Sequence, residues 1–177
     1  DRMLLRELVD TSNAVAATRS RTEKTALVAD LLARAEPGER ALAAHYLSGR
    51  LRQRRTGLGW RSLRALPPPA EAPRLDLATV DRSFAAIAEL AGAGSAAVRA
   101  TQTADLFAQA TAPEQEWLRA VAVGGLRQGA LESIVTDALA RATGIPLSAV
   151  RRAAMLAGGT TDVVDAAVEG PEMLATI

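Results

Sequence analysis

The sequence predicts an all-α fold of two helical lobes, with about nine to eleven short helices and no β-sheet. Apolar residues make up 49% of the 177-residue chain, but aromatic residues only 3%, so the core must consist mainly of Ala, Leu and Val. Closely packed helices suit these side chains better than a sandwich of sheets does. In addition, no stretch alternates polar and apolar residues for long enough to indicate a strand.

The first half of the chain indicates three helices. Residues 3–16 carry an apolar stripe, and Ser20 or Thr22 can cap a second helix that runs to about residue 34. Pro37 suits the first turn of a third helix, which we expect to stop at Gly49. A looser segment, RTGLGWRSL, follows.

The second half is separated from the first by the stretch LPPPAEAPRL at residues 66–75. Four prolines exclude a helix there, so we expect a linker between a first lobe at about 3–66 and a second lobe at about 76–177. A GAGS turn at 92–95 interrupts the second lobe, with Ser95 as the expected helix cap. The predicted helices of this lobe cover residues 78–91, 97–110, 113–123, 130–142 and 146–157.

An internal repeat links the two halves. Residues 20–53 match residues 95–128 without a gap at eleven of 34 positions, and both copies end in Gly-x-Leu-Arg-Gln, as GRLRQ at 49–53 and GGLRQ at 124–128. A composition so rich in alanine would give roughly three matches by chance, so duplication is indicated. We therefore expect two helical pairs related by a pseudo-twofold axis.

The net charge of +1 conceals a strong asymmetry. Residues 1–66 carry a net charge of +6 and the remaining residues −5, and six arginines with no acid lie between Arg50 and Arg64. Such an asymmetry indicates a polyanionic partner. A solvated face in an arginine-rich protein explains the charge alone equally well.

Phosphate binding is the chemistry for which the chain offers the most groups. Helix starts present unpaired N–H groups, glycine lets a phosphate approach them, and arginine adds bidentate contacts. The candidate contacts are Arg52, Arg54 and Arg55 in the first lobe, and Ser95, Arg99, Gly125, Arg127 and Gly129 in the second. Each alone is also explained by an ordinary cap or turn, but their repetition favours binding. Trp60 is either a stacking group beside these arginines or, as we expect, a core anchor.

Groups for catalysis are scarce in this sequence. There is no cysteine, the single histidine is His45, and neither Gly-x-x-x-x-Gly-Lys-Ser/Thr nor Gly-x-Gly-x-x-Gly occurs. A packed or surface histidine explains His45 better than a metal ligand or general base does. We therefore expect no catalytic residue, metal or cofactor in this chain. No apolar run approaches a membrane span, and a cytoplasmic monomer is the simplest interpretation.

The run GSAAVRATQTADLFAQATAPEQEWLRAVAVGGLRQGALESIVTDALA at 94–140 resembles the N-terminal DNA-binding domain of ATP-dependent DNA ligases. The family signature is G-x-LR-x-G-x-x-E-x-x-V-x-x-A-L. Its positions here are Gly124, Leu126, Arg127, Gly129, Glu132, Val135, Ala138 and Leu139. The segments at 18–32 and 46–63 are similar to the first half of that domain, and PLSAVRRAAMLAGGTTDVV is similar to its last helices.

This resemblance implies an all-α domain that grips the minor groove and phosphate backbone of nicked duplex DNA. The nick would be sealed by a nucleotidyltransferase domain that this chain lacks, in an enzyme of DNA repair, replication and recombination. The partners would be nicked duplex DNA and the remaining ligase domains, and ATP and Mg²⁺ would belong to the full-length enzyme. Such ligases use the lysine of a Lys-x-Asp-Gly motif, whereas Lys24, the only lysine here, is followed by Thr-Ala-Leu. The chain is therefore expected to be a non-catalytic domain.

An alternative from another class remains open. A helical protein-interaction module could turn the same arginine-rich face toward an acidic protein, and it would then expose an apolar patch near Trp60. An enzyme that uses His45 would need a pocket with converging polar groups around that residue.

Overall fold

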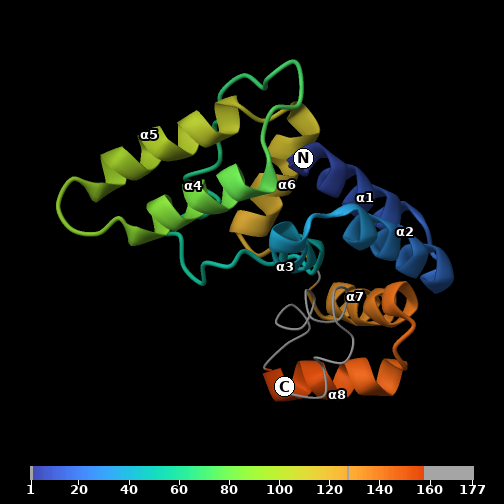
Figure 1. The fold of residues 1–177 in the computed structure, drawn as a ribbon. Helices are drawn as coiled ribbons and strands as arrows, with labels where there is room; N and C mark the ends of the chain where they lie inside the picture. The colour runs from blue at the N-terminus through green and yellow to red at the C-terminus, as the bar shows by residue number, and fades with distance from the viewer. Residues whose placement is uncertain (1, 127, 158–177) are drawn as a thin grey trace.

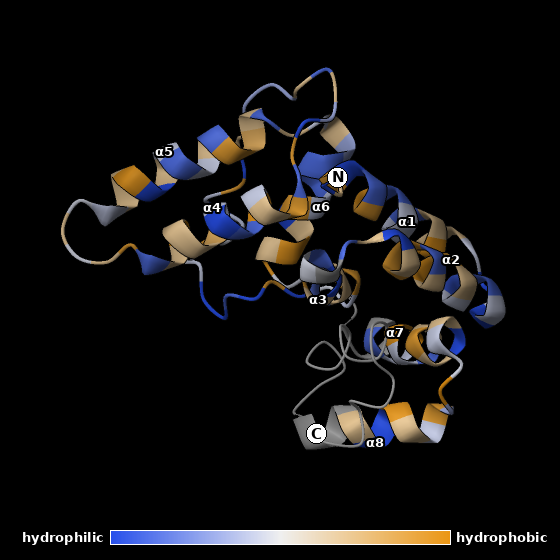
Figure 2. Cartoon of the chain, viewed as in Figure 1, coloured by the Kyte–Doolittle hydropathy of each residue, from blue (hydrophilic) through white to orange (hydrophobic). Residues whose placement is uncertain are grey.

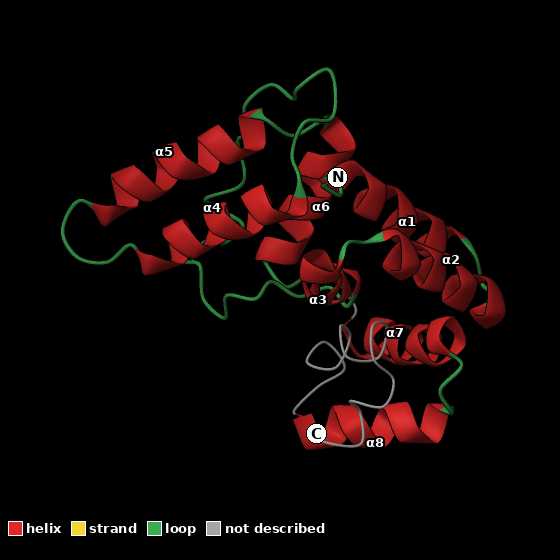
Figure 3. Cartoon of the chain, viewed as in Figure 1, coloured by secondary structure: helices red, strands yellow, loops and turns green. Residues whose placement is uncertain are grey.

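The computed structural model describes residues 2–126 and 128–157, which fold into eight α-helices joined by loops (Figures 1 and 3). The helices are α1 (Leu5–Ala17), α2 (Arg21–Arg34), α3 (Pro37–Leu47), α4 (Leu77–Glu89), α5 (Ser95–Ala108), α6 (Ala112–Ala122), α7 (Gln128–Thr143) and α8 (Leu147–Ala157). The all-α prediction is confirmed. Within these residues the only β-type pairing is an isolated bridge between Leu4 and Asp76.

The expected number of nine to eleven helices is wrong for the described residues, which contain eight. Between α3 and α4 the chain makes only a single helical turn, in which the Leu63 N–H donates to the Gly59 carbonyl at 3.2 Å. That turn cannot be extended, because the prolines that begin at Pro67 lack the required N–H donors.

The helix boundaries follow the capping signals in most places. The Ser20 hydroxyl accepts from the Glu23 N–H at 3.2 Å at the start of α2, and Pro37 is the first residue of α3. The expected cap of α5 is wrong by one residue: Gly94, with φ +81°, is the N-cap, and Ser95 is the first helical residue. This left-handed backbone conformation before the helix suits glycine and not serine.

Helices α3 and α6 meet through an aromatic contact. Tyr46 and Trp117 are buried and meet edge to face, with ring centroids 5.2 Å apart. Burial raises the pKa of Tyr46, so its hydroxyl stays neutral. In Figure 1, α4 and α5 form an arm on one side of this contact, while α1 and α2 lie on the other side. Figure 2 shows that these helices carry hydrophobic and hydrophilic stripes, as expected for helices packed on one face.

The proline-rich segment at 66–75 is bound to the helices along its length. The Ala70 N–H donates to the Ala110 carbonyl at 2.8 Å, and the Gln115 side chain donates to the Pro67 carbonyl at 3.0 Å.

Helix α7, from the second half of the chain, packs against α2, and Arg21 Nε donates to Asp137 Oδ2 at 2.9 Å between them. The division into two lobes at 66–75 stays a prediction.

Helix α3 and helix α6 end in the same way. At α3 the Gly49 N–H donates to the Tyr46 carbonyl at 3.0 Å, and at α6 the Gly124 N–H donates to the Val121 carbonyl at 3.3 Å. In each copy, the next backbone N–H donates to the carbonyl five residues earlier. This second hydrogen bond completes a Schellman motif, in which φ is +81° at Gly49 and +72° at Gly124. The two helices also occupy equivalent positions in the repeat. These similarities agree with duplication, which stays a prediction.

The two neighbouring glycines at the end of α6 should respond differently to substitution. Gly124→Ala should lower the free energy of unfolding by about 1 kcal/mol, because an L-residue is strained in the left-handed region. Gly125→Ala is the matched control and should change it by less than about 0.5 kcal/mol, since φ at Gly125 is not positive and its Cβ would contact the Ala120 carbonyl oxygen at an ordinary 3.5 Å. Urea denaturation measures both values, and equal losses would contradict the assigned Schellman motif.

The cap of α4 should make stability depend on pH. Burial alone would raise the pKa of Asp76, but the hydrogen bond from the Thr79 N–H at 2.7 Å and the ion pair with Arg2 at 3.1 Å lower it below the usual value. Because the folded pKa is depressed, this stabilisation is present above the ordinary aspartate pKa and is lost as pH falls through the folded value.

Asp76→Asn keeps a capping side chain but removes that charge. Urea denaturation of both proteins should therefore give a stability difference that narrows as the pH falls from about 6 to about 2. A difference that is constant over this range would contradict the role assigned to the carboxylate.

Candidate nucleic-acid interface

The ends of the two repeat copies line one cleft. This repeat-end cleft has a volume of about 650 Å³, and it is lined by residues 49–51, 53–58 and 121–124. Gly49 comes from the end of α3 and Gly124 from the end of α6. Tyr46 on α3 and Trp117 on α6 are in contact, and the chain at the C-terminal end of each helix lines this cleft.

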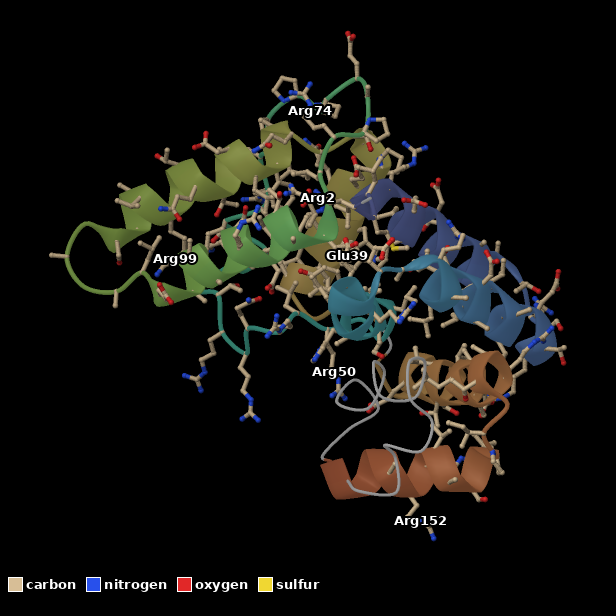
Figure 4. The ribbon with its side chains drawn as sticks, in the orientation of Figure 1. Arg2, Glu39, Arg50, Arg74, Arg99 and Arg152 are labelled. Atoms are coloured by element: carbon tan, nitrogen blue, oxygen red, sulfur yellow. The ribbon has the colours of Figure 1, made fainter. Side chains whose placement is uncertain are left out.

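Three arginines line the repeat-end cleft, and its lining contains no acidic residue. Arg54 and Arg55 are exposed, and no described carboxylate lies within ion-pair distance of either. Arg50 Nη2 lies 3.2 Å from Glu132 Oε2, so the third arginine is held against α7. Figure 4 shows Arg50 at the junction of α3 and α7. The cleft therefore presents the unpaired charges of Arg54 and Arg55 to solvent.

Arg52 is bound to α4 and is not part of the cleft lining. Its Nη1 lies 3.2 Å from Asp81 Oδ2, and the neighbouring Gln53 Nε2 donates to Asp81 Oδ1 at 3.0 Å. The Arg52 side chain is still 57% exposed. Asp81 thus fixes two consecutive residues of the GRLRQ segment, and the chain that follows leads directly into Arg54 and Arg55.

Arg99 supports the loop that precedes Trp60. Its Nη2 donates to the Leu90 carbonyl at 3.1 Å, and its guanidinium covers Gly57 so closely that a Cβ there would lie 2.8 Å from Arg99 Nε. The positive φ of Gly57, +76°, favours glycine at this position. Arg99 therefore joins α5 to the loop (Figure 4), and Ser95 lies one turn earlier on α5, away from the cleft lining.

The second-lobe candidates at 125–129 are placed only in part. The Gly125 N–H already donates to the Ala120 carbonyl at 2.8 Å, so a phosphate would compete with that bond. Gly129 is the second residue of α7. It therefore lies in the first turn of this helix, close to the expected helix start. Arg127 lies outside the described residues. The match of Arg52 with Arg127 therefore remains a feature of the sequence.

Trp60 is on the surface, so the expectation of a core anchor is wrong. Its exposed fraction is 66%, whereas Tyr46, Phe84, Phe107 and Trp117 are all 5% exposed or less. Leu63, which is fully buried, supplies the core contact of the turn in place of Trp60. The arginines on both sides of Trp60 were the signal that could have indicated this position.

Sequence reasoning missed three residues that shape the cleft. Arg50 belongs to the arginine run of the first lobe but is not among the predicted phosphate contacts, although it directly follows a predicted helix stop. Glu132 is a position of the family signature, but neither it nor Asp81 was predicted as an arginine partner, because nothing in their local sequence identifies a partner so distant in the chain. An exposed arginine needs no acidic partner, as Arg54 and Arg55 show, so the arginine run did not indicate these anchors.

No three His, Asp or Glu side chains gather in residues 2–126 and 128–157, and His45 does not line the repeat-end cleft. Over the same part of the chain, no helix is both long and apolar enough to cross a membrane.

Comparison with known proteins gives consistent matches. A family model described as "DNA ligase N terminus" matches residues 61–140. Relatives named "Probable DNA ligase" include those of Beutenbergia cavernae, 58% identical over 94% of this chain and 32% of the relative, and of Nocardioides sp., 53% identical over 99% and 35%. The relative from Anaeromyxobacter dehalogenans is 48% identical over 98% and 35%.

The chain thus spans about a third of the length of the curated relatives that it matches. The family match and the helical fold agree with the resemblance carried by the segment at 94–140. The chain belongs to the family of DNA ligase N-terminal domains.

Proposed function

We propose that the chain grips the minor groove and phosphate backbone of nicked duplex DNA, so that the catalytic part of an ATP-dependent DNA ligase can seal the nick. The observation that carries this proposal is the repeat-end cleft, where both helix ends meet and three arginines face solvent with no acid in the lining. ATP and Mg²⁺ would be bound by the remaining part of the ligase, which is the proposed partner in cis.

The arginines of the cleft suit a phosphate backbone because a guanidinium presents paired N–H donors to phosphate oxygens. Such contacts position a protein on DNA without reading bases, so binding should be independent of sequence. Each neutralised phosphate releases counterions, and the affinity should fall steeply with salt.

The proposed arginine contacts differ in whether their side chains are already bound to an acidic residue. Arg54 and Arg55 are the principal phosphate ligands, while Arg52 adds a contact through its exposed part and Asp81 positions it. Arg127 and Gly129 form the matching contact in the second copy, on sequence grounds. Ser95, Arg99 and Gly125 contribute through the shape of the neighbouring loops as well as through direct contact.

A second candidate function is a protein-interaction module, which the exposure of Trp60 favours. It requires an acidic protein partner that displaces DNA from the arginine-rich face. Competition of DNA with a poly-glutamate chain distinguishes the two functions, because DNA binding by shaped phosphate contacts should survive a charge-matched excess of the polypeptide.

Arg54→Ala and Arg55→Ala should each weaken binding to a nicked duplex and reduce the slope of log affinity against log salt by about one unit. Arg74→Ala is the matched control, since Arg74 is also exposed but lies well away from Arg50 and the cleft (Figure 4). Fluorescence anisotropy with a labelled nicked duplex at several salt concentrations measures the slopes. Equal slopes for all three variants would refute the assignment of the cleft.

Arg127→Ala should produce the same change as the cleft substitutions if the second repeat copy contacts DNA. The expected loss is about one unit of salt slope, and Arg141→Ala, an exposed arginine on α7, is the control. An unchanged slope in Arg127→Ala would restrict the contact to the first copy and would contradict a twofold grip.

A further inference from the structure

Trp60 is an exception among the aromatic residues of this chain. Four of the five aromatic side chains are buried, and Trp60 alone is exposed, at 66%. A tryptophan side chain offers roughly 150–250 Å² of surface that burial would stabilise. A chain so poor in aromatic residues therefore leaves one of its largest apolar groups uncovered.

The exposed indole is held on an anchored turn. Leu63 is fully buried and its N–H donates to the Gly59 carbonyl at 3.2 Å, which closes the turn that contains Trp60. On the other side, the buried Thr56 accepts from the Leu58 N–H at 3.2 Å through its hydroxyl, and Arg99 packs over Gly57. Both ends of the loop are fixed, so presenting Trp60 costs little ordering entropy on binding.

The residues that flank Trp60 in the sequence are cationic. Arg54, Arg55, Arg61 and Arg64 are all exposed, and none has an ion-pair partner among the described residues. No acidic residue occurs between Glu39 and Glu71 in the sequence. Whatever covers Trp60 must therefore be anionic around its edge and flat and apolar at its centre.

Duplex DNA with a strand break meets both conditions. Its phosphates supply the negative charge, and an aromatic side chain stacks on the face of any base. In an intact duplex the base faces are covered by their neighbours, and opening a step costs a few kcal/mol. A break in one strand relaxes that step, so the indole reaches a base face most readily there.

We propose that Trp60 stacks on a base at the strand break while the arginines around it bind the flanking phosphates. This inference rests on the proposed DNA binding and adds a contact that favours nicked over intact duplex. Salt-dependent phosphate contacts supply affinity for both duplexes, and the indole supplies the difference between them.

Fluorescence tests the contact directly, because the chain has only two tryptophans and Trp117 is buried. Titration with a nicked duplex should quench the emission of the 177-residue chain and shield it from acrylamide. In Trp60→Phe, only Trp117 emits, and the same titration should leave the emission unchanged. If the wild-type emission does not respond while anisotropy reports binding, the inference fails and the proposed function stands.

The affinities of Trp60 variants for nicked and intact duplex test whether this side chain favours the nick. Trp60→Ala should weaken binding to nicked duplex by about 5-fold to about 150-fold, the range for loss of one base stack, and should weaken binding to intact duplex less. Trp60→Phe should restore most of the loss, and Val98→Ala, at the other exposed large apolar side chain among the described residues, should bind as wild type does. All variants should keep the wild-type salt slope and unfolding midpoint.

Three other outcomes would contradict the inference or the proposed function on which it rests. Equal loss on nicked and intact duplex would overturn stacking at the break. Shielding of Trp60 that grows with protein concentration in the absence of DNA would show that a second copy covers it, which would also overturn the inference. Failure of the wild-type chain to bind either duplex at low salt would instead overturn the proposed function.

Discussion

The edge-to-face contact between Tyr46 and Trp117 is the interaction on which the candidate site depends. It joins α3 to α6, and both helices end at a glycine with positive φ that turns the chain out of the helix. The chain at the end of each helix lines the repeat-end cleft. An aromatic pair of this geometry contributes about 0.5–1.5 kcal/mol beyond the area it buries, which is enough to favour one arrangement of the two helices.

Ion pairs then fix the charged wall of the cleft. Glu132 on α7 holds Arg50, and Asp81 on α4 holds Arg52, so the two ends of the GRLRQ segment are attached to different helices. Partly exposed pairs of this kind stabilise the fold only weakly. Their effect is positional: the chain between and after them is fixed, and Arg54 and Arg55 are left unneutralised. Acidic residues beside the repeat-end cleft here position the neighbouring cations and do not simply oppose them.

Most of the fold could be predicted from the sequence because its signals are local. Ser20, Pro37 and Gly49 mark helix boundaries through capping geometry, and the structure places α2 and α3 between them. The prediction failed where two nearby residues carried similar local signals. Gly94, and not Ser95, is the N-cap of α5, and Leu63, and not Trp60, lies in the core. Hydrophobicity alone does not decide which of two apolar residues in one turn faces inward.

The site was less predictable because it depends on contacts across the chain. The repeat indicated that two similar segments matter, but only the structure shows that Gly49 and Gly124 line one cleft. Likewise, the sequence presents Arg52, Arg54, Arg55 and Arg99 as equivalent cations. Their partners distinguish them, since Asp81 binds Arg52 and the Leu90 carbonyl binds Arg99, while no described acid pairs with the other two.

The most direct test of the central claim is a nuclear magnetic resonance titration of the arginine Nε–Hε signals with a short nicked duplex. If the repeat-end cleft binds the phosphate backbone, the signals of Arg50, Arg54 and Arg55 should shift together at low salt and return as salt is added. The signal of Arg74 should stay in place. Shifts at Arg74 with no change at Arg54 and Arg55 would contradict the account.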